Sequence, residues 1–234
     1  MQRDRDGSLW RRGCGGRRGA WITAGDSVPS GKIRPMRLGF VATLAQQLPL
    51  TAMTLRLSNG QKLHSPEGLE TRPTTGLVRQ AVMNILAAEL PDCRWLDLCS
   101  GSGAMACEAL LGGASWVQAV ERNPKIAAIA RRNLQGLGSR WAGQWALEIT
   151  AVERWLQTTC SRPFDLIYAD PPYAAGLYGC MAERIKAQGW LKQEGQLLLE
   201  CERQTKPSPP IGWHQVRERR YGRSLVLQWQ LNAE

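Results

Sequence analysis

The segment DLIYADPPYAAG, residues 165–176, places a carboxylate, two prolines and a tyrosine directly after an apolar run. Proline fixes φ and has no N–H to donate, so Pro171 and Pro172 make the turn stiff and extended. The Asp170 carboxylate and the Pro171 carbonyl could accept both N–H groups of an exocyclic amine on a nucleobase, while Tyr173 stacks on the ring. These acceptors favour the amine as it becomes cationic during attack, and Asp170 can take the proton afterwards. Residues 170–173 are therefore predicted to hold an amino group in position for in-line attack on the group that is transferred to it. The alternative is an ordinary Asp turn after a strand.

A second polar turn follows an earlier apolar run, in LDLCSGSGAMA at residues 96–106. Gly101 and Gly103 let a ligand approach the backbone, but the spacing is not GxGxxG and there is no Walker lysine. Glu121 ends the next apolar run about twenty residues later, where an acid can accept both hydroxyls of a ribose. This combination predicts a nucleoside cofactor without phosphates, S-adenosylmethionine, whose ammonium Asp97 could bind. The alternatives are a tight loop at the glycines and a helix N-terminal acid at Glu121.

These turns need strands that end at one edge of a sheet. Strand-like runs at 94–98, 116–121, 145–149 and 164–169 each precede a helical pattern, and further strand-like runs lie at 195–201, 213–220 and 223–230. Alternating strands and helices predict parallel pairing with right-handed crossovers. The last two runs are joined by little more than a Tyr-Gly turn, so the final strand is predicted to be antiparallel. The fold class is α/β, a Rossmann-like, seven-stranded, mostly parallel sheet with an antiparallel last strand.

A small β-hairpin and a helix are predicted to precede this sheet. Residues 54–66 alternate apolar and polar side chains around Asn59-Gly60, a dipeptide typical of type I′ turns. Thr74 or Thr75 can then cap a helix with apolar residues at helical spacing, which is predicted to end by Pro91.

The first 52 residues are rich in Gly and Arg and carry nine basic and three acidic residues, a net +6 of the chain's +10. They show no sustained period of 2 or 3.6, so residues 1–52 are predicted to be a disordered basic extension. Three interpretations stay open: a targeting peptide, an RNA-binding tail, and a misassigned start codon with Met53 as the true initiator. Residues 53–234 are predicted to form the catalytic domain.

Composition excludes several classes. The seven cysteines include no CxxC pair and only two histidines accompany them, so neither a structural zinc site nor a disulfide framework is expected. No window approaches the ~20 apolar residues that a membrane span needs. These features predict a cytoplasmic monomer with reduced thiols and no metal.

The motifs together resemble the RsmD-type small-subunit ribosomal RNA guanine-N2 methyltransferases, from about residue 54 to 231. The most restrictive motif is TRPTTGLVRQAVMNIL at 71–86, followed by LDLCSGSGAMACEALLGGA, DPPY and a Tyr-Gly before the last strand. The resemblance implies a class I methyltransferase with a seven-stranded Rossmann-like domain. It implies that residues 170–173 hold the target guanine and that Glu121 binds the cofactor's ribose. The residues implied at the methionine end of the cofactor are Asp97, Ser100, Gly101 and Gly103, and those at the entrance where cofactor and RNA meet are Arg72, Thr74, Thr75 and Arg79.

Two departures from that family pattern stand out. Ala151 occupies the position where an acidic or amide residue often binds the adenine amino group, so backbone atoms near Ala151 and Val152 would have to replace it. Met83 stands where a larger apolar or aromatic residue is common.

Near the C-terminus, RERRYGR offers a phosphate-binding rim, with Arg219, Arg220 and Arg223 as the RNA contacts, although charge runs of this kind are usually solvated faces.

The sequence as a whole predicts methylation of a guanine N2 in 16S rRNA, within a small-subunit ribosomal particle. A DNA adenine-N6 or cytosine-N4 methyltransferase shares the proline loop, but no target-recognition domain is evident. Protein glutamine methylation uses a similar loop. A non-catalytic RNA-binding protein is the alternative from another class, against which Asp97, Glu121 and Asp170 argue.

Overall fold

The structure is a computed structural model that describes residues 55–65, 76–138, 144–172 and 176–233. All of these lie in one compact unit, Leu48–Glu234. The predictions made for residues 1–52, Arg72, Thr74, Thr75 and Tyr173 fall outside the described residues.

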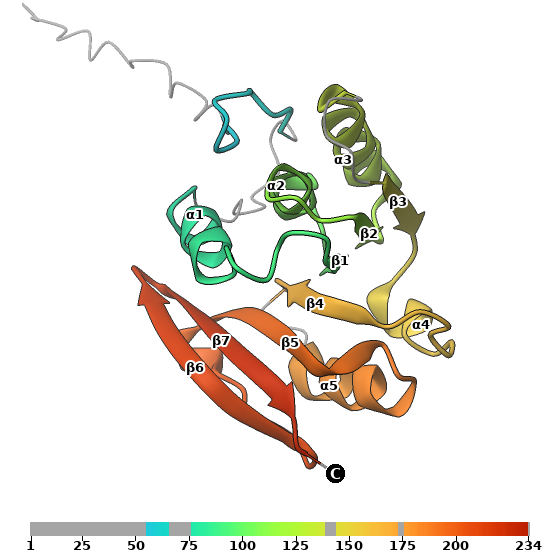
Figure 1. Ribbon diagram of the computed structural model, residues 1–234, viewed down its shortest axis with the longest axis vertical. Helices are drawn as coiled ribbons and strands as arrows, with labels where there is room; N and C mark the ends of the chain where they lie inside the picture. Colours follow the sequence, from blue (N-terminus) through green and yellow to red (C-terminus); the bar gives the residue numbers. More distant parts are fainter. Residues whose placement is uncertain (1–54, 66–75, 139–143, 173–175, 234) are drawn as a thin grey trace, which may run out of the picture. The chain divides into compact units, whose positions relative to one another are not determined.

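A seven-stranded sheet forms the centre of this unit, in the order β3-β2-β1-β4-β5-β7-β6 (Figure 1). The strands are β1 (Arg94–Leu98), β2 (Trp116–Glu121), β3 (Gln144–Ile149), β4 (Phe164–Ala169), β5 (Leu191–Glu202), β6 (Trp213–Tyr221) and β7 (Ser224–Leu231). β1 to β5 pair in parallel, whereas β7 pairs antiparallel with both β5 and β6. The prediction of a Rossmann-like sheet with an antiparallel last strand is confirmed.

Helices cover both faces of the sheet, and all but the first of them connect parallel strands (Figure 1). They are α1 (Gly76–Ile85), α2 (Ala104–Leu111), α3 (Pro124–Gly136), α4 (Val152–Trp155) and α5 (Leu177–Ala187). Side chains alternate across the strands and divide the core in two. Trp95, Val117 and Tyr168 face the apolar residues of α1, α2 and α3. Leu96, Leu98 and Ile167 face those of α4 and α5.

The elements before the sheet also form. Arg56 and Lys62 make an antiparallel bridge around the Asn59-Gly60 turn, and the hairpin buries Leu57 and Leu63. α1 ends at Ile85, six residues before Pro91, and passes into a turn in which the Leu86 N–H still donates to the Val82 carbonyl at 3.1 Å. No helix among the described residues is long and apolar enough to cross a bilayer.

Candidate active site

The carboxyl ends of β1, β2 and β4 meet at one edge of the sheet. In register, Leu98 of β1 lies between Val120 of β2 and Ala169 of β4. The next residues on these strands are Cys99, Glu121 and Asp170, and the glycine turn follows Cys99 directly. Parallel pairing therefore brings the two predicted polar turns to one edge, as strand ends in doubly wound sheets require.

Glu121, the last residue of β2, forms hydrogen bonds with the glycine turn and with the residues that follow β2 and β3. Its Oε2 accepts a hydrogen bond from the Gly101 N–H at 3.0 Å, and its Oε1 accepts one from the Asn123 N–H at 2.8 Å. The Thr150 N–H, after β3, donates to the Glu121 carbonyl at 3.1 Å. The side chain is 8% exposed. Glu121 thus links the glycine turn to the ends of β2 and β3. An acid that only stabilised the N-terminus of the next helix would not bind the glycine turn.

The glycine turn has backbone angles that suit glycine and leave space beside it. Gly101 and Gly103 have φ of 55° and 75°, and nothing lies within 4 Å of the place of a Cβ on Gly101. A Cβ on Gly103 would lie 3.1 Å from the Cβ of Ala130, so glycine there permits α2 and α3 to approach. The Ser100 N–H donates to the Val120 carbonyl at 3.0 Å, but its Oγ is buried with no hydrogen-bond partner among the described residues. An open glycine backbone beside an unpaired buried hydroxyl fits a polar ligand.

Asp97 lies just below the glycine turn, with 1% of its surface exposed. Its Oδ2 accepts a hydrogen bond from the Ala106 N–H in the first turn of α2 at 3.0 Å. The pKa of the carboxyl is raised to about 8. Burial is the main cause and the charge of Glu121 adds to it, whereas the hydrogen bond from Ala106 acts in the opposite direction. Asp97 therefore ties β1 to α2.

Cys99 shows how much negative charge gathers at this edge. Burial raises the pKa of its thiol, and the carboxylates of Glu121, Asp170 and Asp97 raise it further. The thiol is therefore a neutral group and not a nucleophile. Asp97 keeps its proton at neutral pH, so the carboxylates of Glu121 and Asp170 are the groups that favour a positively charged ligand here. Cys99 itself has φ of 61°, a strained value for a residue with a side chain.

Asp170 and the two prolines continue directly from β4. Asp170 is half-buried, Pro171 is buried and Pro172 is exposed, and none of the three belongs to a helix or strand. β4 ends at Ala169, which pairs with Leu199 of β5, so Asp170 is next to Glu200 across the two strands.

Glu200 is a residue of this edge that sequence reasoning missed. It is 2% exposed, and its Oε2 accepts a hydrogen bond from the Tyr168 hydroxyl at 2.7 Å. The Tyr178 hydroxyl donates to the Glu200 carbonyl at 3.0 Å. Tyr168 precedes the proline turn and Tyr178 follows it in α5, so Glu200 holds both ends of that turn. The only sequence signal was an acid at the end of the apolar run LLLE.

The predicted adenine-binding residues lie at the same edge, after β3. Ala151 caps α4 in an extended conformation, and Val152 is buried. Both place backbone atoms beside Thr150, which is bonded to Glu121.

Arg79, predicted at the entrance and as an RNA contact, is instead buried. Its Nε donates to Glu108 Oε1 of α2 at 3.0 Å, and its guanidinium also donates to the Arg56 carbonyl. Glu108 further accepts from the Ser58 N–H at 3.0 Å and the Ser58 hydroxyl at 2.6 Å. Arg79 and Glu108, with side chains 5% and 4% exposed, therefore join the hairpin, α1 and α2.

Arg219, Arg220 and Arg223, which are also predicted to contact RNA, lie at the carboxyl edge and are exposed. β6 runs in the direction of β5 because β7 is antiparallel to both, and Arg219 pairs with Val226, which pairs with Glu200. Arg219 and Arg220 end β6, and Arg223 precedes β7. The structure thus aligns these arginines with the end of β5, two strands from Glu200.

Comparisons with known proteins agree with this fold. A family model described as Conserved hypothetical protein 95 matches residues 57–230. The Ribosomal RNA small subunit methyltransferase D of Escherichia coli K12 is 28% identical over 176 residues, 75% of this chain and 87% of that protein. The protein of the same name from Haemophilus influenzae is 27% identical over 168 residues, 71% of this chain and 86% of its own length. A solved structure of a candidate methyltransferase of Escherichia coli, yhhF, superimposes with a TM-score of 0.66 at 26% identity, covering 75% of this chain and 94% of that one.

Proposed function

This chain belongs to the Conserved hypothetical protein 95 family, and from that premise we propose that it methylates the N2 amine of a guanine in small-subunit ribosomal RNA, with S-adenosylmethionine as donor. The observation that carries the proposal is the meeting of Glu121, Asp97 and Asp170 around an open glycine turn. The relatives named as small-subunit rRNA methyltransferases support the acceptor.

The cofactor would lie along the glycine turn. When bound, it supplies a methyl group on a positively charged sulfur, and the carboxylates that surround Cys99 suit that charge. Ser100 Oγ and the Gly101 backbone would contact its methionine end, together with Gly103 and Asp97. Glu121 would bind its ribose while keeping its bonds to the Gly101 and Asn123 N–H groups, because each carboxylate oxygen has two lone pairs. Backbone atoms at Ala151 and Val152 would face its adenine.

The proline turn would hold the guanine. The Asp170 carboxylate and the Pro171 carbonyl would accept from the N2 amine, which favours that nitrogen as positive charge develops on it. Tyr173 would stack on the base. Arg219, Arg220 and Arg223, exposed at the same edge, would contact RNA phosphates. Arg72, Thr74 and Thr75 would line the entrance.

The test is methyl transfer from labelled cofactor to three acceptors: small-subunit particles, naked 16S rRNA and duplex DNA, each followed by nucleoside analysis. N2-methylguanosine in RNA is expected. N6-methyladenosine or N4-methylcytosine in DNA would instead favour the DNA methyltransferase, and absence of transfer to all three with cofactor bound would favour a non-catalytic RNA-binding protein.

Asp170→Asn gives the sharper test of the residue roles. The variant keeps the shape of the side chain but loses its charge, so we expect turnover to fall by about 100-fold or more, in the range of a lost general base or oxyanion-type contact. Glu148→Gln, which neutralises an exposed carboxylate of β3, is the matched control and should keep normal turnover. Equal rates for Asp170→Asn and the native protein would refute the role given to Asp170.

A further inference from the structure

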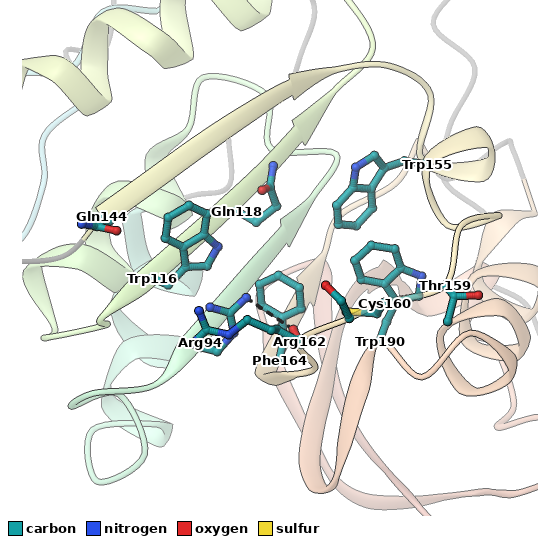
Figure 2. A pocket seen from close by; sticks show the side chains of 11 residues that line it. Arg94, Trp116, Gln118, Gln144, Trp155, Thr159, Cys160, Arg162, Phe164 and Trp190 are labelled. Atoms are coloured by element: carbon teal, nitrogen blue, oxygen red, sulfur yellow. Dashed lines mark hydrogen bonds between the residues drawn. The ribbon is translucent and has the colours of Figure 1, made fainter.

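A cavity of about 310 Å³ opens at the other edge of the sheet, where the strands begin (Figure 2). Its walls come from the starts of β1, β2, β3 and β4, from α4 and from residues 159–162. α4 has only four residues, one helical turn. It leaves the first residues of β2 and β3 uncovered on this face. The cavity is therefore a consequence of the short crossover between β3 and β4, separate from the predicted active site.

Flat aromatic rings form two sides of this cavity. Trp116 of β2 lies on one side, and Trp155 of α4 with Trp190 lies on the other, with Gln118 between them (Figure 2). The rings of Trp155 and Trp190 have centroids 4.1 Å apart and are tilted by 31° to each other. Trp116 and Trp155 are only partly buried, so their rings remain accessible from the cavity. Indole faces arranged in this way suit a flat heteroaromatic ring.

Two arginines line the same cavity. The guanidinium carbon of Arg94 lies 4.9 Å from the ring centre of Phe164 and 5.7 Å from that of Trp116. The Nε of Arg94 is buried without a hydrogen-bond partner among the described residues. The Nη2 of Arg94 donates to the Arg162 carbonyl at 3.3 Å, so the two residues are neighbours. Burial lowers the pKa of Arg94, and the like charge of Arg162 lowers it further.

The nearby carboxylate does not neutralise these arginines. Asp165 accepts from the Arg94 N–H at 2.9 Å and from Lys192 Nζ at 2.5 Å, so its charge is matched by lysine. Within the described part of the chain, neither Arg94 nor Arg162 forms an ion pair with a carboxylate. Two adjacent guanidinium groups without a counter-charge favour an anion, and a phosphate matches their geometry.

We propose that this cavity is a second nucleotide site, in which a base stacks between Trp116 and Trp155 while its phosphate binds Arg94 and Arg162. The Gln118 side chain lines the cavity, and its Nε2 donates to the Ala119 carbonyl at 3.1 Å, so its amide oxygen is the group offered to the edge of the base. A quaternary ammonium ligand would also suit the indoles, but the arginines repel it. β1 separates this site from the glycine turn by roughly 16 Å of strand. The nucleotide can be free or part of an RNA strand, and the experiment below distinguishes these two sources.

The experiment measures binding to the full chain with S-adenosylhomocysteine at saturation, so that the cofactor site is already filled. Guanosine 5′-monophosphate, adenosine 5′-monophosphate and a short single-stranded RNA are added separately, and the ¹⁵N-labelled indole N–H signals of the ten tryptophans are followed by NMR. Saturable shifts at Trp116, Trp155 and Trp190 are expected, with little change at Trp95, Trp213 and Trp229. Shifts with the mononucleotides identify a site for free nucleotides, and shifts with RNA alone identify an RNA contact.

Matched substitutions test which residues bind. Trp116→Leu should weaken binding by about tenfold or more, as loss of one base stack does, whereas Trp145→Leu, on the other face of neighbouring β3, should not change it. Arg162→Gln removes an exposed charge with little effect on folding and should also weaken binding, whereas Arg131→Gln, exposed on α3, should not.

Two outcomes would overturn the proposal: no saturable indole shift with any of the three ligands, or equal affinity for Arg162→Gln and Arg131→Gln in correctly folded protein. Methyl transfer is assayed on separate samples of the same protein preparations, with labelled S-adenosylmethionine in place of S-adenosylhomocysteine. Transfer without binding at the cavity would reject only the second site, and binding at the cavity without transfer would reject only the proposed function.

Discussion

At the scale of single residues, Asp97 makes the stability of the domain depend on pH. Burial raises its pKa to about 8 in the folded protein, above the 3.8 of an ordinary aspartate. Between these values the folded state keeps a proton that the unfolded state has lost. The free energy of unfolding therefore falls as pH rises from about 4 to 8, by up to about 1.4 kcal/mol per pH unit from this group. Above pH 8 the loss is complete.

Asp97→Asn removes that titration. In urea unfolding at pH 5, 6, 7 and 8, the variant should gain stability relative to the native protein as pH rises. Asp92→Asn, at an exposed carboxylate before β1, serves as the control and should show no such trend. A stability difference between Asp97→Asn and the native protein that is independent of pH would contradict the prediction.

Glu200 and Tyr168 give a second prediction at this scale. Glu200→Ala leaves the buried Tyr168 hydroxyl without its acceptor, so the free energy of unfolding should fall by about 2 kcal/mol. Because Tyr168 precedes the proline turn, kcat should fall more than KM rises. Tyr168→Phe combined with Glu200→Ala forms a double-mutant cycle, in which a coupling energy near zero would show that the 2.7 Å contact does not stabilise the turn.

The residues of the glycine turn could be predicted from the sequence because their conformation is local. Gly101 and Gly103 need positive φ, and Glu121 ends the next strand, so strand order alone brings it to the turn. Arg79 and Glu200 could not be placed in this way. Their partners lie 29 and 32 residues away, and no pattern of spacing reveals such contacts.

At the scale of elements, the ion pair of Arg79 and Glu108 holds the N-terminal hairpin against α1 and α2. Arg79→Met keeps the length of the side chain but leaves Glu108 buried without its cation. We expect the free energy of unfolding to fall by about 3 kcal/mol, as for other broken buried pairs. Hydrogen exchange at residues 56–62 should rise more than exchange in β1. Arg132→Met, exposed on α3, is the control. Equal stability of the two variants would contradict this prediction.

Element types were easier to predict than their arrangement. β1, β2 and β4 begin and end at the predicted residues, because apolar runs bounded by turn residues mark them. The position of β7 between β5 and β6 was not predicted, since pairing between strands depends on contacts distant in sequence. α1 ends at Ile85, before the predicted limit at Pro91. Leu86 and Leu90 still pack into the core from the turn that follows, so their apolar spacing alone does not distinguish a turn from a helix.

At the scale of the whole molecule, the family model and the described unit both omit most of the first 52 residues. We predict that a chain beginning at Met53 keeps the thermal unfolding temperature and the methyl-transfer rate of the full chain. Removing nine basic and three acidic residues also reduces the net charge by six, so non-specific RNA binding should weaken at low salt. If the shortened chain loses methyl transfer to its specific substrate by the same factor as it loses non-specific RNA binding, the extension takes part in recognition.

The position of β7 has a consequence for how the protein is made. Among the described strands, β6 is hydrogen-bonded only to β7, yet β7 is synthesised after it. During translation, β1 to β5 can pair as they leave the ribosome, whereas β6 has no partner strand in the sheet until β7 has emerged. The arginines 219, 220 and 223 therefore reach the carboxyl edge only after β7 has joined β5, so a nascent chain has its cofactor turn before it has its basic rim.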